Sequence, residues 1–461
     1  MSTLNVDKVD PSTGTALEIG SSGDTITVPS GATLTTTSAT LNLPTTITAT
    51  TEVKTNKISP ATGTAFALGD SGDTFTVPSG ATIVNSGTAT GFGITQTSFL
   101  PTAEPIMRNG NCAIAQRQVS ATGKTAAGYY TVDAMHMQIS SLGTWTFIQE
   151  AQTSGAAFEA GFANAFRMDC TTANASPSAS NLLQFHYVLE GQDCQVFKKG
   201  TSAAETYTLA FWVKSNKTGT AQVNIRDDNS RVCGGTYTIS SGDTWEHKII
   251  NYAADTTGTV DDDNSAGYQL EFWLDAGSNY TSGTVPTAWE AKVDADLGVE
   301  NLSLGDSTSN DWAITGLQLE VGTYTSADLP PFKFENFGTN LARCQRYFIS
   351  NYKPGYYPGD DVASIHTGLT CGIHVMGSSE GGSSTMSFPQ TMRALPTMKF
   401  YARDGTADKW YWGDMGVDED KEATSNNTGS PSQYGMSVYT GTLNNLNANT
   451  CDGAYTADAE L

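Results

Sequence analysis

Apolar and polar residues alternate along several short stretches in the middle of the chain. A period of two places every second side chain on the same face of a strand. Turns rich in Gly, Asn, Asp and Ser separate the stretches. Many short strands joined in this way predict an all-β sandwich or jelly roll between residues 101 and 336. The alternating stretches are 182–189, 207–214, 245–252, 268–275 and 312–319.

The pattern changes after Pro330-Pro331. Residues 338–352 have the spacing of a short helix, with Leu341, Cys344 and Tyr347-Phe348 on one side. The remaining residues are again rich in turns and aromatic side chains. We therefore expect residues 337–461 to form a short helix followed by a small distal β domain.

The first hundred residues contain an internal repeat. Residues 8–34 recur at 57–83 with 18 of 27 positions identical, and both copies carry strand and turn signals. Residues 1–100 contain no Trp, Tyr, His, Cys or Arg and only four Phe. Such a segment cannot bury a large core as a single chain. It is either a linker or a stalk of several chains, and the shared phase of apolar residues in the two copies favours a stalk of several identical chains.

The composition narrows the possible partners. The chain has 461 residues, 24 Lys and Arg against 47 Asp and Glu, and a formal charge of −23. A negative field of this size repels phosphate backbones, so a nucleic-acid binder is not expected. With 18 Phe, 18 Tyr and 8 Trp, there is ample material for packed cores.

The cysteines and the absence of long apolar runs bear on the cellular compartment. Seven Cys are spread without metal-binding spacing, which indicates reduced, partly buried thiols in a protein assembled in a cytoplasm. The opening residues show no secretory signal, and no apolar run is long enough to span a membrane, so membrane insertion is not expected.

An ordered series of motifs carries a family resemblance. The motifs include NGNCAIAQRQ (109–118), YTVDAMHMQ (130–138), LEGQDCQVFKKG (189–200), YTLAFWVKS (207–215), GDTWEHKIINY (242–252), LDAGSNYTSG (274–283), ITGLQLEVGTYTSADL (314–329) and CQRYF (344–348). This series resembles the carbohydrate-binding-module-like β-sandwich of tailed-bacteriophage tail fibre and tail spike proteins. The opening residues resemble the N-termini of marine-phage fibre proteins, and the segments 389–401 and 455–461 resemble the distal domain that often follows the sandwich.

This resemblance implies a homotrimeric tail fibre in the virion. Its N-terminus would attach to tail adaptor, nozzle or baseplate proteins, and its distal end would bind a bacterial surface polysaccharide during host adsorption. A bacterial adhesin is disfavoured because no signal or anchor is visible in the sequence.

The sandwich strands offer one candidate glycan site. If Tyr207, Leu209, Phe211 and Val213 face the core, as Tyr268, Leu270, Phe272 and Leu274 would in their strand, the intervening residues point outward. The outward set contains Trp212, Trp273 and His186, beside Gln184, Gln269 and Glu271. Aromatic rings can stack on sugar C–H faces while such polar groups bind hydroxyls. The alternative is that a loop or a neighbouring protomer covers these Trp residues.

The distal block offers a second candidate site. Its aromatic residues are Tyr356, Tyr357, Trp410, Tyr411 and Trp412, and the last three alternate on one short strand. Packing in the core of a small domain is the alternative. The distal position and the turn-rich setting favour recognition of the receptor at these residues.

No motif in the sequence predicts catalysis. The loop 121–125 and the segment 377–381 match parts of phosphate-binding and hydrolase motifs only by chance, because the flanking elements that these motifs need are missing. We expect no cofactor, although acidic runs at 227–228, 261–263 and 418–420 could bind a structural Ca²⁺. A binding protein is therefore predicted, and a polysaccharide-degrading tail spike is the alternative.

Overall fold

The computed structural model describes residues 105–362, 369–372, 374–375, 382–414, 417–422, 431–439 and 450–461, together with Val9, Thr25 and Thr27. The chain divides into two compact units, 1–87 and 88–461. The described helices and strands all lie in the second unit. The predicted N-terminal stalk falls almost wholly outside the described residues.

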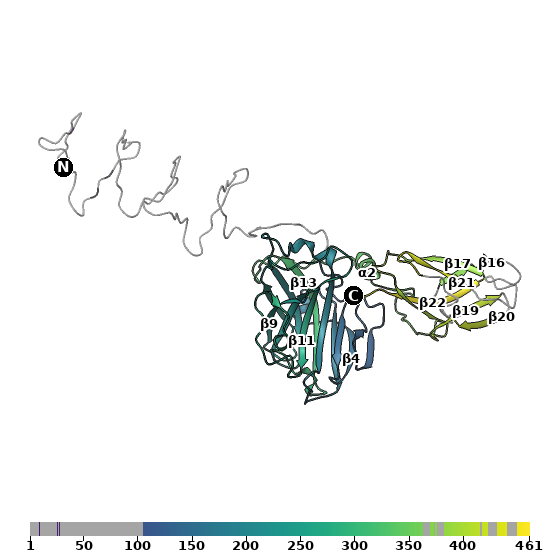
Figure 1. Ribbon diagram of the computed structural model, residues 1–461, viewed down its shortest axis with the longest axis horizontal. Coiled ribbons are helices and arrows are strands. Elements are labelled where there is room, and N and C mark those ends of the chain that lie inside the picture. Colours follow the sequence, from purple (N-terminus) through teal and green to yellow (C-terminus); the bar gives the residue numbers. More distant parts are fainter. Residues whose placement is uncertain are drawn as a thin grey trace. The chain divides into compact units, whose positions relative to one another are not determined.

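Two antiparallel sheets form a β-sandwich in the first part of the second unit (Figure 1). Sheet A has six strands in the order β1-β4-β5-β13-β7-β10, and sheet B has seven in the order β12-β9-β8-β11-β6-β3-β2. The sheet A strands are β1 (Ser120–Lys124), β4 (Thr144–Ala151), β5 (Asn164–Thr172), β7 (Tyr207–Lys214), β10 (Glu246–Tyr252) and β13 (Asp311–Val321). Those of sheet B are β2 (Gly128–Tyr129), β3 (His136–Ser140), β6 (Leu182–Glu190), β8 (Gly219–Asp227), β9 (Arg231–Ile239), β11 (Ala266–Ala276) and β12 (Glu290–Ala291). The prediction of an all-β, jelly-roll-like sandwich is confirmed for these residues.

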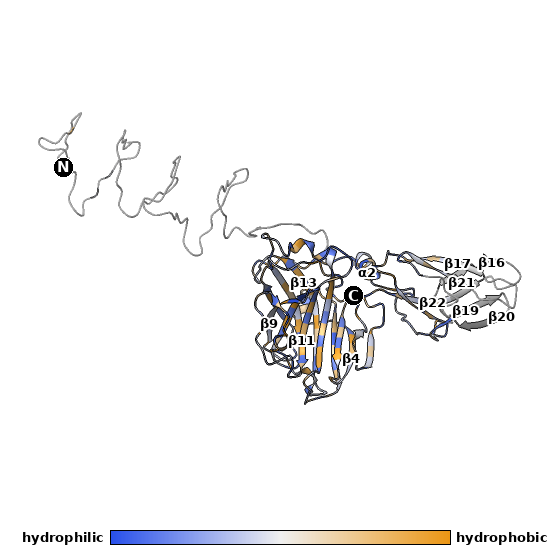
Figure 2. Ribbon diagram, in the orientation of Figure 1, coloured by the Kyte–Doolittle hydropathy of each residue, from blue (hydrophilic) through white to orange (hydrophobic). Residues whose placement is uncertain are grey.

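The core lies between the two sheets and is built from alternate residues of each strand. Figure 2 shows the corresponding alternation of hydrophobic and hydrophilic positions along the strands of the sandwich. The side chains predicted to face inward on β7 and β11 are all buried in one continuous cluster. Phe272 sits at its centre and stacks edge-on against Phe185, Phe211 and Tyr237. The strand faces inferred from the sequence are therefore correct. The predicted inward residues are Tyr207, Leu209, Phe211, Val213, Tyr268, Leu270, Phe272 and Leu274.

Helices in the described residues are few and short. They are α1 (Ala156–Glu159), α2 (Phe337–Gln345) and three 3₁₀ turns at Gly191–Phe197, Asp294–Asp296 and Leu304–Asp306. The helix expected over residues 338–352 is α2, but it ends at Gln345 and the chain continues at once as a strand. Asn336 caps its start by accepting a hydrogen bond from the Thr339 amide at 2.9 Å.

The residues after α2 form further antiparallel strands. A sheet with the path β14-β22-β19-β20 also takes in β15 and β18 through β22, and β16, β17 and β21 form a second sheet. A small core of aromatic and methionine side chains includes Phe388, Phe400, Met436 and Tyr455. The strands are β14 (Phe348–Ser350), β15 (Leu369–Gly372), β16 (His374–Val375), β17 (Gly382–Ser387), β18 (Thr397–Tyr401), β19 (Lys409–Asp414), β20 (Val417–Glu422), β21 (Gly435–Tyr439) and β22 (Thr450–Asp458).

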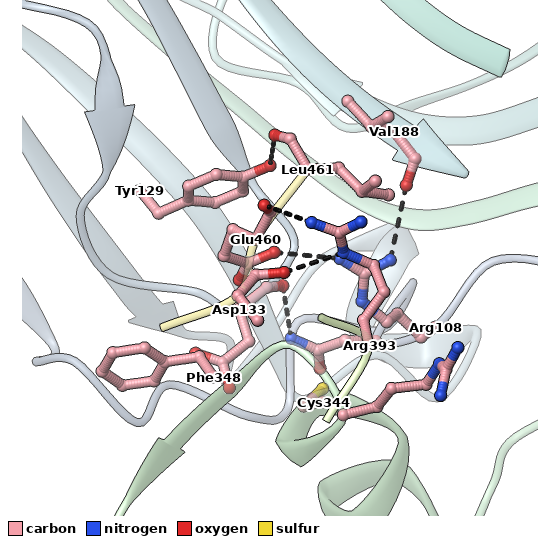
Figure 3. Close-up of polar contacts among 12 residues, drawn as sticks. Arg108, Tyr129, Asp133, Val188, Cys344, Phe348, Arg393, Glu460 and Leu461 are labelled. Atoms are coloured by element: carbon pink, nitrogen blue, oxygen red, sulfur yellow. Dashed lines mark hydrogen bonds and ion pairs between the residues drawn. The ribbon is translucent and has the colours of Figure 1, made fainter. Parts of the chain in front are cut away.

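Buried charges join this distal block to the sandwich. Figure 3 shows Arg108 and Asp133 of the sandwich beside Glu460, which follows β22. Arg108 donates to Glu460 at 3.2 Å, and Arg117 lies 3.3 Å from Glu460 and 3.5 Å from Asp133. The two guanidinium groups also stack on aromatic rings, Arg108 on Tyr347 and Arg117 on Phe348. We call Arg108, Arg117, Asp133 and Glu460 the junction network.

A second ion pair reinforces the junction. Arg346, just after α2, donates two hydrogen bonds of 2.7 Å to the buried carboxylate of Glu190 in β6. Such a bidentate contact fixes orientation as well as distance. The guanidinium holds the pKa of Glu190 below its usual value despite the opposing effect of burial.

Five of the seven cysteines are free thiols and are buried, as the sequence predicts: Cys112, Cys170, Cys194, Cys233 and Cys344. Burial raises the pKa of Cys112 to about 12 and that of Cys233 to about 11. These thiols are therefore not the low-pKa, exposed kind that reacts readily.

Candidate functional site

A cleft lies on the outer face of sheet B, the face turned away from the core. It has a cavity volume of about 380 Å³. Its floor comes from four adjacent strands, β3, β6, β11 and β8, and its wall from the loop that follows β11. The lining includes His136, Gln138, Gln184, His186, Arg226, Gln269, Glu271, Trp273, Tyr280, Lys292, Asp294, Leu297 and Leu461.

The strand register explains why these side chains gather. His136, His186, Glu271 and Asn224 are consecutive register partners across the four strands. One step along the strands, Gln138, Gln184, Trp273 and Gln222 form the next outward row. Residues two apart on a strand share a face, so polar residues at alternate positions produce a continuous polar floor.

A chain of hydrogen bonds fixes the protonation of His186. Arg226 can only donate, and it bonds to the side-chain oxygen of Gln269. The amide nitrogen of Gln269 must then face His186, where it donates to Nδ1 at 2.7 Å. The ring proton of His186 is therefore on Nε2, which lies 2.8 Å from Oε1 of Gln184.

Both histidines in the cleft are neutral at ordinary pH. Burial, together with the nearby His136 and Arg226, places the pKa of His186 well below its usual value. Burial and the charge of Arg117 lower the pKa of His136 to about 4. The two rings lie 5.7 Å apart, so a proton on either one would repel a proton on the other.

The charged residues of the cleft are already paired with one another. Arg226 donates from Nε to Oε1 of Glu271 at 2.7 Å. On the wall, Nζ of Lys292 lies 2.7 Å from the carboxylate of Asp294. Each cation that lines the cleft thus has a carboxylate partner that also lines the cleft.

The loop after β11 covers the outer face of Trp273. Gly298 packs directly on the indole, and a Cβ at this position would lie 2.6 Å from the ring. The Tyr280 ring stands 5.1 Å from the Trp273 ring. Main-chain oxygens of Asp296 and Leu297 accept bonds of 2.8 Å from Gln222 and Asn224 and so hold the loop on the sheet.

Two polar atoms on residues of the lining have no hydrogen-bond partner. These are Oε2 of Glu271 and Nε1 of Trp273, and both are shielded from water. Leaving such an atom unpaired costs about 1–3 kcal/mol. Because both atoms are shielded from water, a ligand in the cleft reaches them only if the loop after β11 moves.

The structure separates the two Trp residues that the sequence placed together. Trp273 lies in sheet B, is 1% exposed and is covered by the loop, which was the alternative considered from the sequence. Trp212 lies on the outer face of sheet A, where its ring is 5.0 Å from His247 and packs beside Trp245. The two side chains do not form a common platform. His186 is a floor residue of the cleft, as its outward phase indicated.

The distal candidates occupy other places. Tyr356 and Tyr357 line a smaller cavity of about 230 Å³ between the loop after β14, α2 and the segment 113–116. Trp410, Tyr411 and Trp412 belong to β19, which pairs with β20 and β22, and their side chains lie outside the described residues. The structure therefore does not bring the two groups of aromatic residues into one described site.

His136, Gln138 and Arg226 were missed in the sequence as site residues. His136 and Gln138 alternate within the motif 130–138, which was the available signal. Arg226 precedes the acidic pair 227–228, which the sequence offers as possible Ca²⁺ ligands.

Among the described residues, no group of three or more His, Cys, Asp or Glu is arranged to hold a metal ion. Asp263 instead accepts from the Ser265 amide at 2.8 Å, and Asp227 from the Arg231 amide at 2.7 Å. The side chains of residues 418–420 lie outside the described residues. No helix in the described part of the chain is long and apolar enough to cross a membrane.

The described residues form a two-sheet β-sandwich with a polar cleft on one outer face, and comparisons with solved structures match about half of the chain at low TM-scores. The enzymatically active domain of tailspike protein 4 of bacteriophage CBA120 is 10% identical with a TM-score of 0.25, covering 47% of this chain and 21% of that one. A proposed sugar-binding protein from Bacteroides thetaiotaomicron is 14% identical with a TM-score of 0.26, covering 47% and 100%.

A third solved structure to which the chain is similar is a carbohydrate-binding module. The family 11 carbohydrate-binding module from Clostridium thermocellum is 11% identical with a TM-score of 0.19, covering 44% of this chain and 86% of that one. At these scores the likeness establishes neither a shared family nor a shared ligand. No protein-family description and no curated protein matches the sequence.

Proposed function

We propose that this protein binds a bacterial surface polysaccharide in the cleft of sheet B. The observation that carries the proposal is the polar floor, in which side-chain amides, an imidazole and a carboxylate are linked by hydrogen bonds and line a cavity of about 380 Å³. Sugar rings present hydroxyls that both donate and accept. A few fixed polar groups in a cavity of this size are typical of small-ligand recognition.

The biological setting of this proposal is a phage tail fibre. The N-terminal repeat and the ordered series of motifs support a virion protein whose first hundred residues attach to the tail and whose β domains meet the host cell. In this setting three chains wind together through the repeat. Light scattering of the full-length protein should return about three times the chain mass of 48.7 kDa, and a stable monomer with an ordered N-terminal segment would contradict the trimer.

Binding is tested with the full-length protein and the purified surface polysaccharide of a host strain in affinity electrophoresis. A double variant, Gln138→Ala with Gln269→Ala, removes two amides from the floor. We expect it to weaken binding by about 10-fold or more, since each lost hydrogen bond contributes about 1 kcal/mol. Thr171→Ala, an exposed change on sheet A, is the matched control and should bind like the parent. Equal binding by all three proteins would reject the cleft as the site.

A polysaccharide-degrading activity is the second candidate. Two carboxylates, Glu271 and Asp294, line the cleft, and glycoside hydrolysis uses a pair of carboxyl groups. We favour binding without cleavage because both carboxylates are engaged in ion pairs. Incubation with the polysaccharide separates the two functions, because only an enzyme releases soluble reducing ends.

A further inference from the structure

The pairing of charges in the cleft indicates which polysaccharides it accepts, and this inference rests on the proposed function. We infer that the cleft selects neutral sugars, and that the Glu271–Arg226 pair excludes uronates and other anionic sugars. The protein as a whole is strongly acidic, but the selectivity comes from the way in which the charges in the cleft are paired.

An anionic sugar would need a cation in the cleft to balance its charge. Arg226 gives Nε to Glu271 and Nη2 to Gln269, and Lys292 pairs with Asp294. A sugar carboxylate could use either cation only by competing with a carboxylate that is already in place. A bidentate contact uses two N–H groups on one edge of the guanidinium, and the edge formed by Nε and Nη2 is already committed to Glu271 and Gln269.

The second step concerns the neutral groups of the floor. His186 is held as the Nε2–H tautomer by Gln269 and Gln184, and its pKa lies well below the usual value. The pKa of His136 is about 4. Neither ring supplies a positive charge at neutral pH, so the floor offers a sugar hydrogen bonds but no cation to balance an anionic group.

The third step concerns the unpaired carboxylate oxygen. Oε2 of Glu271 accepts no hydrogen bond, and the Glu271 side chain is 5% exposed. Because this oxygen is shielded from water, a ligand in the cleft meets its negative charge rather than a direct hydrogen bond. A like charge placed against it in a partly desolvated site is strongly unfavourable.

The experiment compares each polysaccharide with its own neutral form. Uronate-containing bacterial capsular polysaccharides are carboxyl-reduced, which converts each uronate to the neutral hexose and leaves every linkage in place. Full-length protein is titrated with the two forms by calorimetry at low and moderate salt. We expect each carboxyl-reduced polysaccharide that binds to have an affinity at least about 10-fold higher than its acidic form, because like-charge contacts are costly. Their affinity should change little with salt.

The variant Glu271→Gln sharpens the test. It removes the negative charge, frees Arg226 from its carboxylate partner and nearly preserves the shape of the side chain. We expect the preference for the reduced form to shrink at least about 10-fold, with the acidic form gaining affinity. Glu205→Gln, which removes the carboxylate of the Lys198–Glu205 pair outside the cleft lining, is the matched control and should leave the preference unchanged.

The experiments distinguish a failure of the inferred selectivity from a failure of the proposed function. If the acidic forms bind as tightly as the reduced ones, and the Gln138→Ala, Gln269→Ala double variant weakens both, the cleft binds polysaccharide but the inferred selectivity is wrong. If the double variant weakens binding of no polysaccharide, the proposed function itself is wrong, and the inference falls with it. An unchanged preference in Glu271→Gln would show that this residue does not set the selectivity.

Discussion

The cleft of sheet B and the junction between the sandwich and the distal block both bury charged side chains, but they use them differently. In the junction, Arg108 and Arg117 surround Glu460, and their guanidinium groups are covered by aromatic rings. In the cleft, Arg226 and Glu271 belong to a chain of side-chain hydrogen bonds that lines a cavity of about 380 Å³. Charges enclosed between protein side chains hold two parts together, whereas a hydrogen-bonded polar surface beside a cavity is suited to a ligand.

The junction should show the largest effect on stability. Glu460→Ala leaves two buried guanidinium groups without their shared carboxylate, and breaking buried pairs of this kind costs about 3–5 kcal/mol. Urea unfolding should report this loss. Lys198→Ala, which breaks the partly exposed Lys198–Glu205 pair, is the control and should cost at most about 1 kcal/mol. Similar losses in both variants would mean that the junction network does not hold the two parts together.

The cleft should show the reverse pattern, with a large effect on binding and a small one on stability. Gln269→Ala removes the link between Arg226 and His186. We expect polysaccharide affinity to fall by about 1–2 kcal/mol and the free energy of unfolding by less. Calorimetric titration and urea unfolding of the same samples measure the two quantities. A larger effect on unfolding than on binding would make the hydrogen-bond chain structural.

Acid should disturb the cleft through its histidines. In the unfolded chain a His takes up a proton near pH 6.5, whereas the folded pKa of His136 is about 4 and that of His186 is also lowered. Between these values the unfolded state holds more protons, so stability falls as the pH is lowered, by at most about 1.4 kcal/mol per pH unit for each His. His136→Gln should flatten the pH dependence of unfolding in this window. An unchanged profile would contradict the assignment of the shift to His136.

Trp212 should show the smallest effect on binding. It lies on the outer face of sheet A, away from the cleft, so Trp212→Ala should change polysaccharide affinity less than about twofold while lowering stability by about 1 kcal/mol through lost packing. A marked loss of affinity with a small loss of stability would place a second sugar site on sheet A.

The sequence predicted the features that follow from the order of residues within a single strand. Alternation gave the inward faces of β7 and β11 and the outward phase of His186, because side-chain direction follows directly from a period of two. It could not show that Trp212 and Trp273 belong to different sheets, because phase within a strand says nothing about which strands are neighbours.

The sequence also could not predict that a loop covers Trp273. It depends on Gly298 fitting against the indole and on Gln222 and Asn224, about seventy residues earlier, holding the main chain of the loop. The cleft also combines four strands whose order in the sheet, β8-β11-β6-β3, differs from their order in the chain. Only the long-range register brings Arg226, Glu271, His186 and His136 together.

The pairing of Phe348 with Asp458 has a consequence for how such a protein can change. These two residues are register partners in β14 and β22. The strand that begins the distal block is therefore hydrogen-bonded to the strand that ends it. An excursion with adjacent ends can be lengthened, shortened or replaced without shifting its anchors. The segment between them can therefore be exchanged as a cassette by recombination or by design, provided that Arg108, Arg117 and Glu460 are kept.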